Sequence, residues 1–141
     1  MRRASPAAAA LAVAMTLFAL GCSGESYEEP AVCGDLDSVR VAMEHLQNAN
    51  VSENGLEQVR TDLNRLRDEL TALADQADGQ FQPQIDAVRQ AAAGLRSSVS
   101  AAKAESTTSE VSTEALDAVS TSVVAVREAV RDLGIVMTNT C

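Results

Sequence analysis

The sequence predicts an all-α protein that folds as an antiparallel, up-down four-helix bundle. From residue 32 onward, apolar residues recur in alternating steps of three and four, as in helices that bury a narrow stripe and cross at about +20°. No stretch alternates apolar and polar residues with a period of two, so we expect no strands. Aromatic residues make up only 2% of the chain. The core must therefore be built from Ala, Val and Leu, which favours closely packed helices.

Each of the four expected helices carries one apolar stripe, with polar residues between its members. The first two stripes comprise Val32, Leu36, Val39, Met43 and Leu46, then Leu56, Val59, Leu63, Leu66, Leu70, Leu73 and Ala77. The last two comprise Ile85, Val88, Ala92, Leu95, Val99 and Ala102, then Leu116, Val119, Val123, Val126, Val130 and Leu133. Each stripe marks the face that its helix is expected to bury.

The breaks between the first three helices contain residues that typically begin and end helices. Residues 48–52 are poor in helix formers, and Ser52 is expected to cap the second helix, with Glu53 in its first turn. Gly79 is expected to act as the C-cap of that helix, and Pro83 suits the first turn of the third.

The last break is the polar run 105–110, after which Ser112 or Thr113 starts the fourth helix. In an antiparallel four-helix bundle, the first helix starts at the end of the bundle where the fourth helix finishes. Cys33 and Cys141 both lie at that end of the predicted bundle.

A three-helix arrangement remains an alternative at this point. Ala77, Phe81 and Ile85 continue the apolar pattern at four-residue steps. The second and third helices could then form one long helix that is kinked near Pro83.

Residues 1–21 have the organisation of a secretory signal peptide. Arg2 and Arg3 supply positive charge, an uncharged run rich in Ala and Leu follows over residues 4–20, and the small residue Gly21 comes next. No stop-transfer charges follow the apolar run, so we do not interpret it as a membrane-spanning helix.

Residues 18–22, Phe-Ala-Leu-Gly-Cys, resemble the lipobox of bacterial lipoproteins, with Ala19 where Leu is commoner. In that family the cysteine thiol receives a diacylglyceryl group and becomes the new N-terminus after cleavage. The resemblance implies that Cys22 is lipidated and that the protein is anchored to the membrane on its extracytoplasmic face. Residues 22–30 are poor in apolar side chains and are interpreted as a flexible tether. The bundle domain then covers residues 31–141.

Cys33 and Cys141 remain once Cys22 is assigned to the lipid. An even number of cysteines in an exported chain points to a disulfide. The loop that this bond closes contains about a hundred residues, for which the chain-entropy relation gives an upper value of roughly 4–5 kcal/mol. Metal binding would need more ligands nearby, and His45 is the only histidine. We therefore predict a disulfide and no metal site.

The charge of the processed chain excludes one class of partner. Removal of residues 1–21 takes away Arg2 and Arg3 but no acidic residue, so the formal charge falls from −9 to −11. Nucleic acid needs a basic footprint and is excluded as a partner. The near absence of aromatic residues also argues against a conventional small-molecule pocket.

The sequence contains no recognisable catalytic arrangement. His45 lies between Met43 and Leu46 and is expected on the surface. The serines and threonines of residues 97–113 have no histidine partner, so no nucleophile–base pair can be assembled. Phosphate-binding glycine loops, calcium loops and zinc-ligand spacings do not occur. We expect no enzymatic activity, catalytic residue or cofactor.

Four carboxylates of the second helix, at Glu57, Asp62, Asp68 and Glu69, could be read as an acid–base set. They alternate with arginines on the polar faces, and the pairs Asp62–Arg65 and Arg65–Glu69 have the spacing of helix-surface ion pairs. We interpret the set as a solvated charged face.

The processed domain is similar to small, acidic, uncharacterised helical lipoproteins of high-GC Gram-positive bacteria, which also carry one cysteine near the start and one at the end. This resemblance implies no known activity. The leading hypothesis is a non-enzymatic, lipid-anchored module of the cell envelope that acts in interaction or structure, with an envelope protein as partner. The alternative is a binding or carrier bundle that holds an apolar small molecule or a lipid between its helices.

Overall fold

The computed structural model describes residues 28–141, and these residues form an all-helical domain. The helices are α1 (Ala31–Asn48), α2 (Leu56–Ala77), α3 (Gln82–Ser106) and α4 (Thr113–Met137), with a short 3₁₀ turn, η1 (Glu53–Gly55), before α2. No strand occurs among the described residues. The predicted all-α fold is confirmed.

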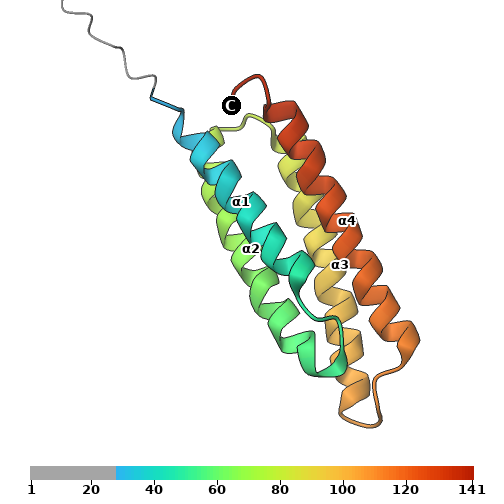
Figure 1. Cartoon of the computed structure of the whole chain (residues 1–141). Coiled ribbons are helices and arrows are strands. Elements are labelled where there is room, and N and C mark those ends of the chain that lie inside the picture. Colours follow the sequence, from blue (N-terminus) through green and yellow to red (C-terminus); the bar gives the residue numbers. More distant parts are fainter. Residues whose placement is uncertain (1–27) are drawn as a thin grey trace, which may run out of the picture.

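The four helices run alternately up and down and pack side by side as a four-helix bundle (Figure 1). Each helix packs against the next one in the chain, and α4 returns to pack against α1. The chain therefore enters α1 and leaves α4 at the same end of the bundle (Figure 1). We call this the cysteine end, because Cys33 and Cys141 lie there.

The predicted stripes form one continuous core. Every predicted stripe residue is buried except Val32 and Leu116, which are partly buried and pack against the core. Ala42 and Met137 complete the core at positions outside the predicted stripes. Burial of a leucine side chain contributes about 1.5–3 kcal/mol, so the leucines of α2 are among the main contributors to stability.

A sharp turn separates α2 from α3, so the alternative of one long kinked helix is wrong. Three residues of the turn have a left-handed backbone: Asp78 (φ 47°), Gly79 (φ 84°) and Phe81 (φ 58°). Such residues end the helical hydrogen-bond pattern. The C-cap of α2 is Asp78, and the predicted Gly79 follows it directly. Pro83 lies in the first turn of α3, as predicted.

The loop between α1 and α2 differs from its prediction. The Ser52 side chain makes no capping hydrogen bond, and α2 starts only at Leu56, after the 3₁₀ turn. Gly55 is buried and lies against the backbone of Asn50, where an added Cβ would be 1.7 Å from the carbonyl oxygen. This close approach folds the loop back on itself, and the capping prediction is wrong because the chain turns before the helix begins.

The loop between α3 and α4 is organised by Ser112, one of the two predicted starting residues. Its Oγ accepts a hydrogen bond from the Ala115 N–H at 3.1 Å, which is an N-cap. The Glu105 carboxylate in turn accepts from the Ser112 N–H at 3.0 Å and from its hydroxyl at 2.9 Å. These hydrogen bonds join the end of α3 to the start of α4 across the loop.

Candidate functional site

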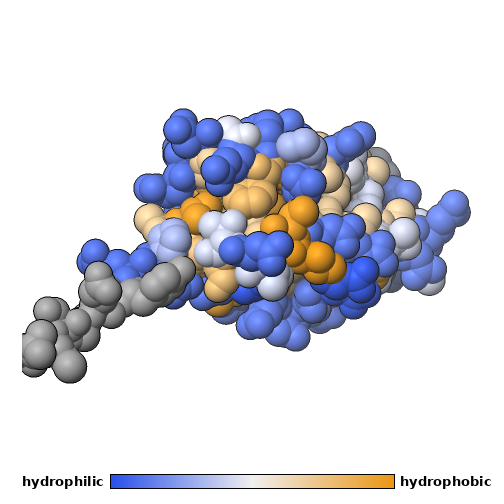
Figure 2. Space-filling model, turned by 90° about the horizontal axis from the view of Figure 1, so that it is seen from above, coloured by the Kyte–Doolittle hydropathy of each residue, from blue (hydrophilic) through white to orange (hydrophobic). Residues whose placement is uncertain are grey.

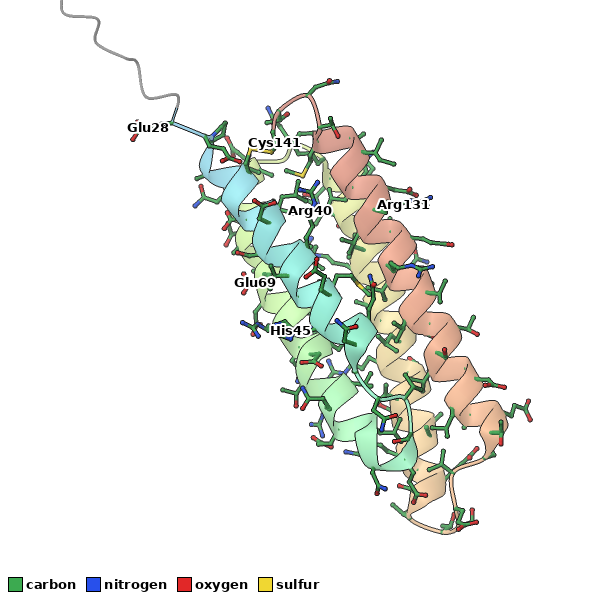
Figure 3. The ribbon with its side chains drawn as sticks, viewed as in Figure 1. Glu28, Arg40, His45, Glu69, Arg131 and Cys141 are labelled. Carbon is green, nitrogen blue, oxygen red and sulfur yellow. A yellow bond between two sulfur atoms is a disulfide. The ribbon has the colours of Figure 1, made fainter. Side chains whose placement is uncertain are left out.

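The cysteine end joins the two extremities of the domain. Cys33 lies in the first turn of α1 and is 1% exposed. Cys141 follows α4 through a turn in which the N–H groups of Thr140 and Cys141 both donate to the Met137 carbonyl at 2.9 Å. Although 108 positions separate the two cysteines, their Cα atoms are 5.5 Å apart, which is disulfide distance (Figure 3). The predicted meeting of these residues is confirmed.

Several predictions fall outside the described residues. Residues 1–27 are not described, and they include the predicted signal peptide at 1–21, the predicted lipidation site Cys22 and most of the tether at 22–30. Glu28, Glu29 and Pro30 are described, and they are exposed and not helical. Across residues 28–141, no helix is both long enough and apolar enough to cross a bilayer.

Apolar side chains reach the surface close to the cysteine end. Figure 2 looks onto that end and shows apolar residues among mostly hydrophilic ones. Near the end of α4, Ile135 is 63% exposed and Val136 is 41% exposed.

The predicted chemistry-bearing residues do not gather into one place. His45 is exposed, as the pattern indicated. No group of three or more His, Cys, Asp or Glu side chains in the described region could hold a metal ion. The four carboxylates of α2 lie on two helix faces, and none of the side-chain hydrogen bonds of the described residues joins one of them to a histidine or a hydroxyl side chain.

Asp62 corrects the interpretation of α2 as a uniformly solvated charged face. It is 7% exposed, and its Oδ1 accepts a hydrogen bond from the Gln58 amide at 2.9 Å. The expected ion pairs Asp62–Arg65 and Arg65–Glu69 are absent from the described residues. Asp62 is the sequence neighbour of the core residue Leu63. The packing of the bundle therefore covers a side chain that the helical periodicity placed at the surface.

Glu57 instead makes the ion pair that links α2 with α3. It contacts Lys103 of α3 and also Arg60 of its own helix, the latter at 3.4 Å. The hydrogen bond from the Lys103 ammonium, and then its positive charge, lower the pKa of Glu57. The Glu57–Lys103 pair shows which residues of the two antiparallel helices lie at the same level.

A groove runs along the surface between α2 and α3, and we call it the α2–α3 groove. Its central part has a volume of about 550 Å³ and continues toward Lys103. Most of the lining side chains are small, polar or positively charged, and Leu63, Asp68 and Val99 also line the groove. The small, polar and positively charged residues include Arg60, Asn64, Arg67 and Thr71 of α2, and Arg89, Ala92, Ala93, Arg96, Ser100 and Lys103 of α3.

Sequence reasoning missed the α2–α3 groove, although the spacing of its cations was a readable signal. Arg60 and Arg67 are seven residues apart, and so are Arg89, Arg96 and Lys103. Positions seven residues apart lie on the same helix face. Only the packing of α2 against α3 shows that the two rows share one groove.

A second surface hollow lies between α1 and α4 and is bridged by Arg40. Its guanidinium lies over Gly134, where an added Cβ would be 3.1 Å from the nearest nitrogen (Figure 3). Like the α2–α3 groove, this hollow is lined by several charged side chains. Neither is an apolar cavity within the core, so the carrier hypothesis stays a prediction without a structural observation that favours it.

No family model matches this chain, and no curated protein and no solved structure is similar to it. The functional argument therefore depends on the sequence signals and on the geometry of the bundle.

Proposed function

We propose that the protein is a lipid-anchored module on the extracytoplasmic face of the cell membrane, with an interaction or structural role and no catalytic activity. The observation that best supports this proposal is the position of the cysteine end. The chain emerges from Pro30 at that end of the bundle, eight residues after the lipobox cysteine Cys22. An eight-residue segment spans at most about 28 Å when extended. A lipid on Cys22 would keep this end close to the bilayer.

The helices would then project the rest of the domain away from the membrane. A 25-residue helix such as α3 or α4 is about 37 Å long. Its far end would therefore reach further from the bilayer than a compact domain of similar mass. This shape suits a module that presents side surfaces to other envelope components.

We further propose that Cys33 and Cys141 form a disulfide in the exported protein. Their Cα separation of 5.5 Å supports this, and an oxidising compartment favours the bond. The bond would tie the anchored start of the domain to its C-terminus, so that the α1–α4 contact cannot open from the membrane side.

The absence of an assigned catalytic group is part of the proposal. The single histidine, His45, is exposed, and Glu57 is engaged in ion pairs. Ser98, which lies in the serine- and threonine-containing stretch 97–113, is hydrogen-bonded to Ser122 of α4 at 2.9 Å, and serine is not a general base. Turnover of a substrate by the purified domain would contradict this part.

Metabolic labelling with a palmitate analogue tests the anchor. The wild-type protein should be labelled and recovered with membranes, whereas Cys22→Ser should be unlabelled. Cys33→Ser is the matched control and should keep the label, because it leaves the lipobox intact. Labelling of Cys22→Ser, or no labelling of the wild type, would contradict the proposal.

A further inference from the structure

The cations of this acidic domain are concentrated in the α2–α3 groove. The processed chain has nine Lys and Arg residues, because Arg2 and Arg3 are lost from the total of 11. Five of the nine line this one groove: Arg60, Arg67, Arg89, Arg96 and Lys103. The groove is therefore a local exception to the overall negative charge of the protein.

The five cations form a regular ladder along the groove. On each helix, residues seven positions apart are separated by about 10 Å along the axis. Because Lys103 of α3 faces Glu57 of α2, the antiparallel register places Arg67 between the levels of Arg89 and Arg96. Arg60 similarly lies between Arg96 and Lys103. Cations from the two walls thus alternate over about 20 Å.

Two of these cations are available for a ligand. Arg89 pairs with Asp86 at 3.2 Å, and Arg60 and Lys103 share Glu57. Arg67 and Arg96 form no ion pair with any described residue, although both line the central part of the groove. A guanidinium group offers paired N–H donors that match a carboxylate.

The floor of the groove limits what can lie in it. Ala92 is buried beneath the groove and Ala93 is exposed in it. Both side chains are small enough to let another backbone approach closely, and Asn64 and Thr71 offer hydrogen bonds. Lining carboxylates, Asp68 within the groove and Glu57 beside Lys103, would repel a polymer that carries a negative charge on every unit. They tolerate a ligand whose negative groups are spaced apart.

We infer that the α2–α3 groove docks an acidic α-helix of a protein partner, with carboxylates about one turn apart facing Arg67 and Arg96. Acidic residues at alternating three- and four-residue intervals on the partner share one helix face and recur about every 5 Å, which matches the alternation of cations from the two walls. Charge complementarity sets the orientation of the partner helix. The small side chains in the groove set the distance between the partner helix and the α2–α3 pair. The inference rests on the proposed function and names the class of partner.

A binding experiment with a synthetic probe tests the groove directly. The probe is a helical peptide of Ala and Gln with Glu at alternating three- and four-residue steps, and a peptide of identical composition with scrambled Glu positions is its control. NMR titration of the labelled protein should show tighter binding of the first peptide, with shifts confined to α2 and α3. Raising the salt concentration should weaken it.

Substitutions identify the residues responsible. Arg67→Gln/Arg96→Gln should weaken binding of the regularly spaced peptide at least tenfold. Arg127→Gln/Arg131→Gln on α4 removes the same charge elsewhere and should change affinity less than twofold. Equal binding of the two peptides, equal effects of the two double variants, or tighter binding of inorganic polyphosphate in the groove would overturn the inference.

Photo-crosslinking of the full anchored chain in its host tests the groove inference separately from the proposed function. A crosslinker in place of Ala93, on the groove floor, should capture an acidic helical segment, and Arg67→Gln/Arg96→Gln should abolish that product. A crosslinker at the exposed Ser120 of α4 is the control. Capture of a partner only from Ser120, or of a second copy from Ala93, would overturn the groove inference and leave the proposed function standing. No capture from any surface position would count against both.

Discussion

The two ends of the bundle are closed by different means. At the cysteine end, Cys33 meets Cys141, and the α2–α3 turn depends on left-handed backbone at Asp78, Gly79 and Phe81. At the opposite end, the loop before α2 depends on the close packing of Gly55, and the loop before α4 depends on hydrogen bonds of Ser112.

This difference shows how an anchored module can distribute its stability. A covalent link in the proposed disulfide resists opening whether or not the surrounding side chains are well packed. Loops that are held by individual hydrogen bonds contribute only about 1 kcal/mol for each bond. We therefore expect the opposite end to open first in local unfolding, as amide hydrogen exchange can measure.

The largest effect should come from breaking the cysteine end. Cys33→Ser/Cys141→Ser should lower the free energy of unfolding by about 2–4 kcal/mol, because the unfolded chain regains the entropy of a large loop. Urea denaturation measures this change. The wild-type protein in reductant should unfold like the variant, and identical curves for the oxidised and reduced wild type would contradict the disulfide.

The next effect should come from the opposite end, at Gly55. Gly55→Ala should destabilise the protein by about 1–3 kcal/mol, because the new Cβ overlaps the Asn50 carbonyl oxygen. Gly94→Ala is the control, since Gly94 lies within α3 and has open space around an added Cβ. It should stabilise the protein by about 0.5–1 kcal/mol. Thermal unfolding of both variants checks the opposite signs.

A smaller effect should come from the cap of α4. Ser112→Ala should cost about 1 kcal/mol, because the Ala115 N–H and the Glu105 carboxylate both lose a partner. Ser52→Ala should change stability by less than about 0.5 kcal/mol, since Ser52 makes no capping hydrogen bond. If chemical denaturation shows similar losses of unfolding free energy for the two variants, the proposed difference between the two loops is contradicted.

The smallest effect should be a pH dependence of the same loop. Hydrogen bonds from the Ser112 N–H and then its hydroxyl lower the pKa of Glu105 in the folded state. This contribution to stability is therefore present above the unfolded-state pKa and is lost as pH falls through the lower folded-state pKa. Glu105→Gln should reduce the loss of thermal stability between pH 7 and pH 3. Glu110→Gln, in the same loop, should leave that loss unchanged.

Much of the fold could be predicted from local sequence pattern. The stripes of all four helices indicated the core, and Pro83 and Ser112 indicated where α3 and α4 begin. These predictions succeed because helical periodicity and capping depend on neighbours within a few residues. The meeting of Cys33 and Cys141 followed from the topology of an antiparallel bundle.

Other features depended on contacts between distant segments. The periodicity of Ala77, Phe81 and Ile85 left a continuous helix open, and only the turn geometry excluded it. The burial of Asp62 depends on which face of α2 its neighbours cover. The start of α2 depends on Gly55 packing against Asn50, which a cap at Ser52 does not predict.

By itself, the sequence determined the helical class, the buried face of each helix and the residues expected to anchor and cross-link the chain. Its regular spacing of apolar and charged residues acts within single helices, where 3.6 residues per turn decides which side chains share a face. The tertiary structure alone decided how the two rows of cations on α2 and α3 come together. That outcome depends on the relative register of the two helices, which the packing of their buried faces determines and the Glu57–Lys103 contact reports.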